Sequence, residues 1–158
     1  MADKTLKRID QVTAGIEKSS SIVQAGLGQI TSNPENLKRA EMLVQIAKSD
    51  HASFKKRVID TLLGHGSTKS GELPDHHGCR LGKWYDSITD VQIRSIPAFG
   101  CLIEPHERVH RHGKLALDYH AKNDPAGALV EAKKMDQASL DVIAMLDELH
   151  RKIAEKQD

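Results

Sequence analysis

The chain has 158 residues, of which 28% are charged and 3% are aromatic, and its formal net charge is +1. This length suits one domain that buries about two thirds of its unfolded surface. A net charge so close to zero leaves no basic surface for phosphates, so we expect no nucleic-acid partner. The scarcity of aromatic side chains favours helices packed through aliphatic residues over sheets.

The N-terminal region is predicted to be one amphipathic helix. Its stripe, with intervals of three and four residues, comprises Leu6, Ile9, Thr13, Ile16, Ser20, Val23, Leu27 and Ile30. Such intervals place all these positions on one face of a helix. The sequence SNPEN at 32–36 interrupts the stripe. We therefore treat residues 1–32 as a separate N-terminal helix and residues 33–158 as the main domain.

A second long helix is predicted to begin at Asn33 and Pro34, because asparagine can cap a helix and proline fits its first turn. Its inward face comprises Leu37, Ala40, Val44, Ala47, His51, Phe54, Val58 and Leu62. The helix is expected to stop at Gly64, where the irregular connection GHGSTKSGELPDHHG begins. His51 therefore lies on an otherwise apolar face.

A short helix is predicted from Cys79 to about Ile88, followed by a break near Pro97. The next long stripe comprises Phe99, Leu102, His106, Val109, Gly113 and Leu117. Pro105 either kinks this helix or marks its true start.

The last helix is predicted to begin at Asp124 as cap and Pro125 as first residue. Its inward face comprises Ala128, Ala132, Met135, Ser139, Val142, Leu146, Leu149 and Ile153. Together these elements predict an all-α fold, an antiparallel four-helix bundle with an additional short helix that carries Cys79.

Three histidines, His51, His106 and His110, occupy the inward faces. Burying a polar ring without a partner costs about 1–3 kcal/mol, so three such rings in one bundle require a common reason. A metal ion supplies one, because histidine nitrogen and cysteine sulfur are donors that zinc prefers, and Cys79 would complete a tetrahedron. Two alternatives stay open: a single inward histidine is usually a satisfied core residue, and the spacing of His106 and His110 also arises by chance.

The remaining candidates receive structural interpretations. Cys101 is expected to be a packed thiol and Trp84 a core anchor, although Lys83 and Trp84 could also orient the cysteine. His76 and His77 could bind metal, but adjacent residues in a loop are more often solvated. Solvated or polar-face positions are therefore expected for His65, His76, His77, His112, His120, His150, Asp86 and Asp90.

Four sequence elements together resemble the chemoreceptor zinc-binding (CZB) domain family of bacteria. They are His51, GCRLGKWY at 78–85, PAF at 97–99 and PHERVH at 105–110. The resemblance covers roughly residues 45–150, and its C-x-x-G-K-W element is specific because the chain contains one Trp.

The resemblance implies zinc held by His51, Cys79, His106 and His110 in a helical bundle that often forms a homodimer. The family is usually joined to chemoreceptors or diguanylate cyclases, where zinc, or oxidation of its cysteine by hypochlorous acid, sets the output. Neither effector domain is present here, so we expect such a partner in cis or in trans. The helix at 1–32 is then a dimerisation helix or the stub of a longer signalling helix.

The expected function is a zinc-binding sensory or regulatory domain that signals by conformational change to a chemotaxis or cyclic-di-GMP partner. Zinc with four protein ligands has no open position for water, so we expect no enzyme. A structural, zinc-stabilised dimerisation bundle is the first alternative. A di-iron bundle is the second, but Glu104 and Glu107 lack the required spacing from the histidines. Because no leader and no apolar run near 20 residues is evident, we expect a cytoplasmic location without membrane insertion.

Overall fold

The computed structural model describes residues 34–156, so the helix predicted for residues 1–32 lies outside the described residues. Its elements are α2 (Pro34–Leu62), the 3-10 helix η1 (Ser70–Glu72), α3 (Arg80–Ser87), α4 (Val91–Arg94), α5 (Pro97–Ala121) and α6 (Pro125–Ala154). Residues 34–156 contain helices and no strand, which confirms the all-α class. None of these helices is long and apolar enough to cross a membrane.

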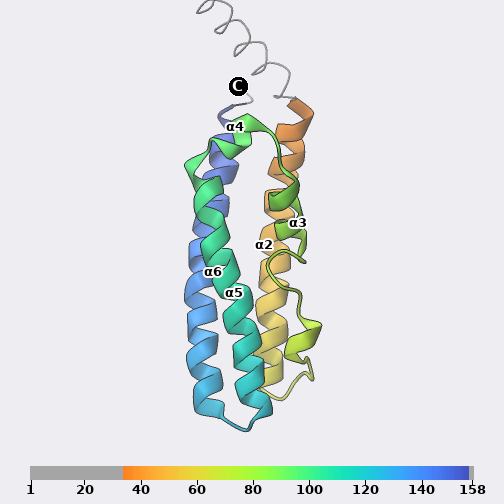
Figure 1. Ribbon diagram of the computed structural model, residues 1–158, viewed down its shortest axis with the longest axis vertical. Coiled ribbons are helices and arrows are strands. Elements are labelled where there is room, and N and C mark those ends of the chain that lie inside the picture. Colours follow the sequence, from red (N-terminus) through yellow and green to blue (C-terminus); the bar gives the residue numbers. More distant parts are fainter. Residues whose placement is uncertain (1–33, 157–158) are drawn as a thin grey trace, which may run out of the picture.

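Three long helices, α2, α5 and α6, lie side by side along the long axis of the molecule (Figure 1). α5 and α6 form an antiparallel hairpin, whereas α2 and α5 run in the same direction. The parallel arrangement requires a long return path, and residues 63–96 provide it. This connection carries η1, α3 and α4 along the side of α2 and α5 (Figure 1).

The long helices begin and end where the sequence predicts. Pro125 is the first residue of α6, and the Asp124 carboxylate caps that helix by accepting the Gly127 amide at 2.8 Å. α2 ends at Leu62, and Gly64 follows with a φ of 77°, which glycine adopts without strain. Pro105 is buried inside a continuous α5, so the alternative that this helix begins at Pro105 is wrong.

The core consists of the three predicted inward faces. Every predicted inward position of α5 and α6 is buried, and so is every one on α2 except Leu62, which is half-buried. Fully burying one large aliphatic side chain contributes about 1.5–3 kcal/mol, so these faces supply most of the force that holds the helices together. Tyr85 stacks on Phe99 with ring centroids 4.4 Å apart, and Trp84 meets Phe99 edge-on at 5.7 Å, which docks α3 on α5.

Several predictions about single residues are wrong. Cys101 is exposed, because it lies two residues after Phe99 and so points away from the core. Asp90 is buried, since its carboxylate caps α4 by accepting the amides of Gln92 and Ile93. His112 is also largely buried: its Nδ1 lies 2.6 Å from the carboxylate of Glu131 on α6.

Candidate metal centre

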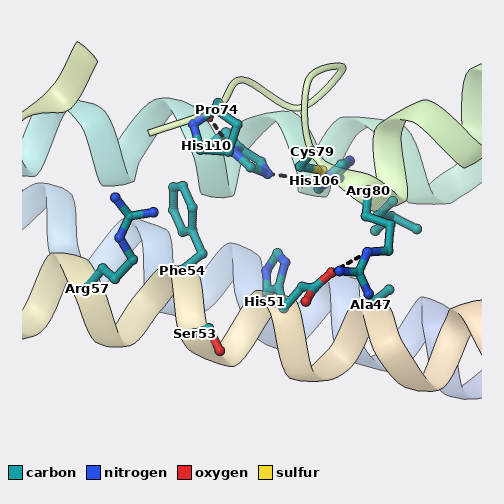
Figure 2. A pocket seen from close by; sticks show the side chains of 12 residues that line it. Ala47, His51, Ser53, Phe54, Arg57, Pro74, Cys79, Arg80, His106 and His110 are labelled. Atoms are coloured by element: carbon teal, nitrogen blue, oxygen red, sulfur yellow. Dashed lines mark hydrogen bonds and ion pairs between the residues drawn. The ribbon is translucent and has the colours of Figure 1, made fainter. Parts of the chain in front are cut away.

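A cavity of about 280 Å³ opens between α2, α5 and the segment that precedes α3. All four residues predicted as ligands line it: His51, Cys79, His106 and His110. Figure 2 shows His51 rising from α2 on one side, with His106, His110 and Cys79 on the other. The fold therefore brings segments that lie far apart in the sequence to one cavity.

Cys79 is the N-cap of α3, so it immediately precedes the short helix that was predicted to begin with it. Its sulfur accepts the amide N–H of Gly82 at 3.3 Å and lies 3.7 Å from the carbonyl oxygen of His76. The turn before it is held by Asp75, whose Oδ1 accepts the amides of His77 at 3.1 Å and Gly78 at 2.6 Å. The sulfur is therefore fixed by the local backbone.

His106 and His110 are one turn apart on α5, and both are almost fully buried. Their Nε2 atoms are 3.1 Å apart, and the Cys79 sulfur lies 3.3 Å from Nε2 of His106. These three ligand atoms all lie within 4.8 Å of one another. A single ion can therefore be reached by all three.

The tautomer of His110 follows from a hydrogen bond on its other nitrogen. Nδ1 lies 2.9 Å from the carbonyl oxygen of Pro74, and a carbonyl can only accept, so Nδ1 carries the proton. In a neutral ring this leaves a lone pair on Nε2, which points toward His106 and Cys79. Metal-binding histidines usually donate their second nitrogen in this way.

His51 lies across the cavity from the other three side chains. Its ring centroid is 6.2 Å from that of His106, and it does not belong to the cluster of three. The side chain is 5% exposed, and among the described residues its Nε2 has no hydrogen-bond partner. Leaving a buried polar atom unsatisfied costs about 1–3 kcal/mol, so this nitrogen fits a ligand better than a satisfied core histidine.

Burial lowers the pKa of each of the three histidines. The value falls to about 4 for His51 and His110 and to about 3 for His106, with repulsion between neighbouring rings adding to the effect for His51 and His106. All three rings are therefore neutral near pH 7 and keep a lone pair for a cation. Burial also raises the pKa of the Cys79 thiol, which a bound divalent cation would reverse.

The donor set fits zinc. The one carboxylate that lines the cavity, that of Asp50, is paired with Arg80 at 3.4 Å. The remaining sulfur and imidazole nitrogens are the ligands that select zinc over magnesium, calcium or a di-iron centre. When bound, zinc would convert the Cys79 thiol into a thiolate and satisfy the unpartnered nitrogen of His51.

Sequence reasoning missed one neighbour of this cluster. His76 was expected to be solvated like His77, but its side chain is half-buried and its ring centroid is 6.1 Å from that of His106, with the two planes perpendicular. The H-x-x-C spacing to Cys79 was the available signal.

Residues 51–117 match the family model described as the chemoreceptor zinc-binding domain. The matched segment begins at His51 and includes Cys79, His106 and His110. No curated protein and no solved structure matches the chain significantly.

Proposed function

We propose that the chain is a regulatory domain of the chemoreceptor zinc-binding family, whose model matches residues 51–117, and that its zinc is held by His51, Cys79, His106 and His110. One observation supports this most directly. Two Nε2 atoms and one sulfur converge on a cavity whose opposite wall carries the unpartnered Nε2 of His51. A set of four protein ligands leaves no open position for a substrate, which supports a regulatory role over an enzymatic one.

Metal analysis of the untagged protein tests this proposal. We expect about one zinc per chain, as for a closed structural-type site. His51→Ala should weaken zinc binding, because the proposal assigns His51 as a ligand. Two irons per chain, or no bound metal after purification in the presence of zinc, would contradict the proposal.

We propose further that the site senses oxidants through Cys79. A zinc-bound thiolate is nucleophilic, and hypochlorous acid would oxidise it by two electrons: the sulfur gains the oxygen as a sulfenic acid and chloride leaves. The weakened ligand would no longer hold the turn before α3. The N-cap position supports this coupling, because the same sulfur accepts the Gly82 amide at the start of the helix.

A second cysteine provides a matched control for this step. We expect hypochlorous acid at low molar excess to transfer zinc from the wild-type protein to a colorimetric chelator and to increase proteolytic access to the segment before α3. Cys101 is exposed and so accessible to oxidants, but it is not a proposed ligand, so Cys101→Ser should respond like wild type. An equal oxidant response in zinc-loaded Cys79→Ser would refute redox sensing and support a purely structural role for the zinc site.

We propose that residues 1–32 form the fourth helix of the bundle and that this helix docks in a groove between α2 and α6. The groove has a volume of about 400 Å³ and includes Ala52, Ile59 and Ile143. Two further apolar side chains, Met42 on α2 and Leu63 just after its end, are 65% and 64% exposed. An amphipathic helix that folds back at SNPEN would run antiparallel to α2 and cover this groove. His51 lines both the groove and the metal cavity, so this helix would lie next to the site.

Disrupting the apolar stripe of residues 1–32 tests this arrangement in the full-length chain. We expect Ile16→Asp to increase deuterium uptake in the segment around Ile59, whereas Lys18→Asp, which lies off the stripe, should leave uptake unchanged. Sedimentation of the same proteins reports whether a second copy covers the groove instead. Equal uptake in all three proteins would contradict docking of residues 1–32.

We also propose a homodimer that acts in the cytoplasm on a chemoreceptor or a diguanylate cyclase, in cis or in trans. The family's name supports a chemotaxis context. A purely structural role as a zinc-stabilised dimerisation bundle is the competing proposal, and the oxidant experiment separates the two.

A further inference from the structure

The two adjacent histidines before Cys79 have different environments. The His77 side chain is exposed, and its Nδ1 lies 2.8 Å from the carboxylate of Asp86. The His76 side chain is half-buried and lies edge-on against His106. His76 therefore lies next to the cluster of proposed metal ligands, while His77 is paired with Asp86 at the surface.

The local backbone keeps His76 close to Cys79. Both residues lie in the turn at 75–79, which the Cys79 amide closes by donating to the Asp75 carbonyl oxygen at 3.2 Å, and the Cys79 thiol lies 3.7 Å from the His76 carbonyl oxygen. A spacing of two intervening residues is common between zinc ligands, because a turn of this length lets both side chains reach one ion. The turn precedes α3, so the His76 ring can reorient without unfolding a helix.

The ring contacts distinguish the two imidazoles of this turn. The His76 ring lies against a ring of the cluster, with its centroid 6.1 Å from that of His106, whereas His77 pairs with Asp86 at the surface. His76 is therefore the imidazole of this turn that is placed to reach an ion held by the cluster.

We propose that His76 is an auxiliary zinc ligand that takes the coordination position of Cys79 when the sulfur is no longer a thiolate. This inference rests on the proposed zinc function. Exchange of a sulfur for a nitrogen donor leaves a closed site of four imidazoles, with weaker but retained zinc binding. Oxidation of Cys79 then changes the shape of the turn at residues 75–79 and lowers zinc affinity without leaving an open coordination position.

Zinc titrations of four variants test the proposal against a matched control. Cys79→Ser is expected to bind zinc more weakly than wild type but measurably. Adding His76→Ala to Cys79→Ser should weaken binding by a further factor of about 10–100, the size of the loss that supporting residues of metal sites produce. Adding His77→Ala to Cys79→Ser should change nothing, because His77 faces the surface. His76→Ala alone should bind zinc like wild type, because the thiolate then holds the position.

Cobalt(II) spectra provide a second readout that does not depend on affinity. Cobalt-loaded Cys79→Ser should lose the sulfur charge-transfer band but keep the intense visible bands of a four-coordinate ion, and the His76→Ala addition should weaken those bands. If the double variant fails to fold, Cys79→Ser/His76→Phe retains the ring without the nitrogen donors and should give the same result.

The outcomes separate this inference from the proposed function. Equal zinc affinity in Cys79→Ser and Cys79→Ser/His76→Ala would overturn the auxiliary role while leaving the four-ligand site intact. An equal loss from His76→Ala in the wild-type and Cys79→Ser backgrounds would also overturn it, because it would show ordinary structural support. Absence of zinc binding by wild type would refute the proposed function itself.

Discussion

Replacing His106 with leucine is expected to remove most of the zinc-dependent stabilisation of the fold. Nε2 of His106 is the central atom of the cluster, 3.3 Å from the Cys79 sulfur and 3.1 Å from Nε2 of His110. Loss of a residue that only supports a ligand already costs about 10–100-fold in metal affinity, so loss of this ligand should cost more than about 100-fold. In wild type, zinc at 1,000 times its dissociation constant should add about 4 kcal/mol to the free energy of unfolding.

Thermal unfolding with and without zinc measures this effect. Wild type should unfold roughly 10 °C or more higher with zinc. His106→Leu should keep only a small part of this rise, because zinc would then be at less than about 10 times the weakened dissociation constant and would add less than about 1.4 kcal/mol. The metal-free variant should be about as stable as metal-free wild type, because leucine fills the space without leaving a buried polar atom unsatisfied. His120→Ala, on an exposed part of the same helix, is the control and should retain the full zinc effect. A zinc-induced rise in His106→Leu equal to that of wild type would exclude His106 as a ligand.

The Gly82→Ala substitution is expected to displace the turn that carries Cys79. A Cβ at position 82 would lie 1.8 Å from the carbonyl oxygen of His76 and 2.8 Å from Cα of His77. These are backbone atoms, so the turn itself has to move. The Gly82 amide also donates to the Cys79 sulfur, and a displaced turn would lose that bond and draw the sulfur away from His106.

Helix propensity alone would predict that Gly82→Ala stabilises the protein, whereas we expect it to destabilise the protein. Gly82 lies within α3, where alanine alone would stabilise a helix by about 0.5–1 kcal/mol. We expect the clash to outweigh this gain, so that Gly82→Ala lowers both the unfolding temperature and the zinc affinity in calorimetric titration. Gly100 is the matched control, because a Cβ there meets nothing within 4 Å and Gly100→Ala should be neutral or slightly stabilising. Normal zinc affinity in Gly82→Ala would show that the turn does not position Cys79.

The long helices were predictable because each has one continuous inward face. The spacing in α6, for example, assigned Met135 and Leu146 to the core, and both are fully buried. The cap at Asp124 was predictable for a similar reason, since it depends on residues a few positions apart. Periodicity identifies a face but not the neighbours of that face, so the pairing of His112 with Glu131 could not be read from the sequence.

The candidate site was predictable only in part. His106 and His110 share a helix face, so their proximity follows from helix geometry. The position of Cys79 depends on an irregular connection with no periodicity. Donor chemistry made Cys79 a candidate ligand, and the resemblance to a zinc-binding family strengthened the prediction that it folds back onto the bundle. The different environments of His76 and His77 were not predictable, because a turn sends adjacent side chains in directions that its backbone angles determine.

The long connection between α2 and α5 determines which surface of the domain would differ between the zinc-loaded and the zinc-free protein. Cys79 lies in this connection, whereas α6 contributes none of the proposed ligands and packs along α5. Within this connection, η1 and α3 lie on the side of the molecule away from α6 (Figure 1). A partner protein that distinguishes the loaded from the empty domain is therefore expected to recognise this outer side, and the α5–α6 hairpin would present the same surface in both states.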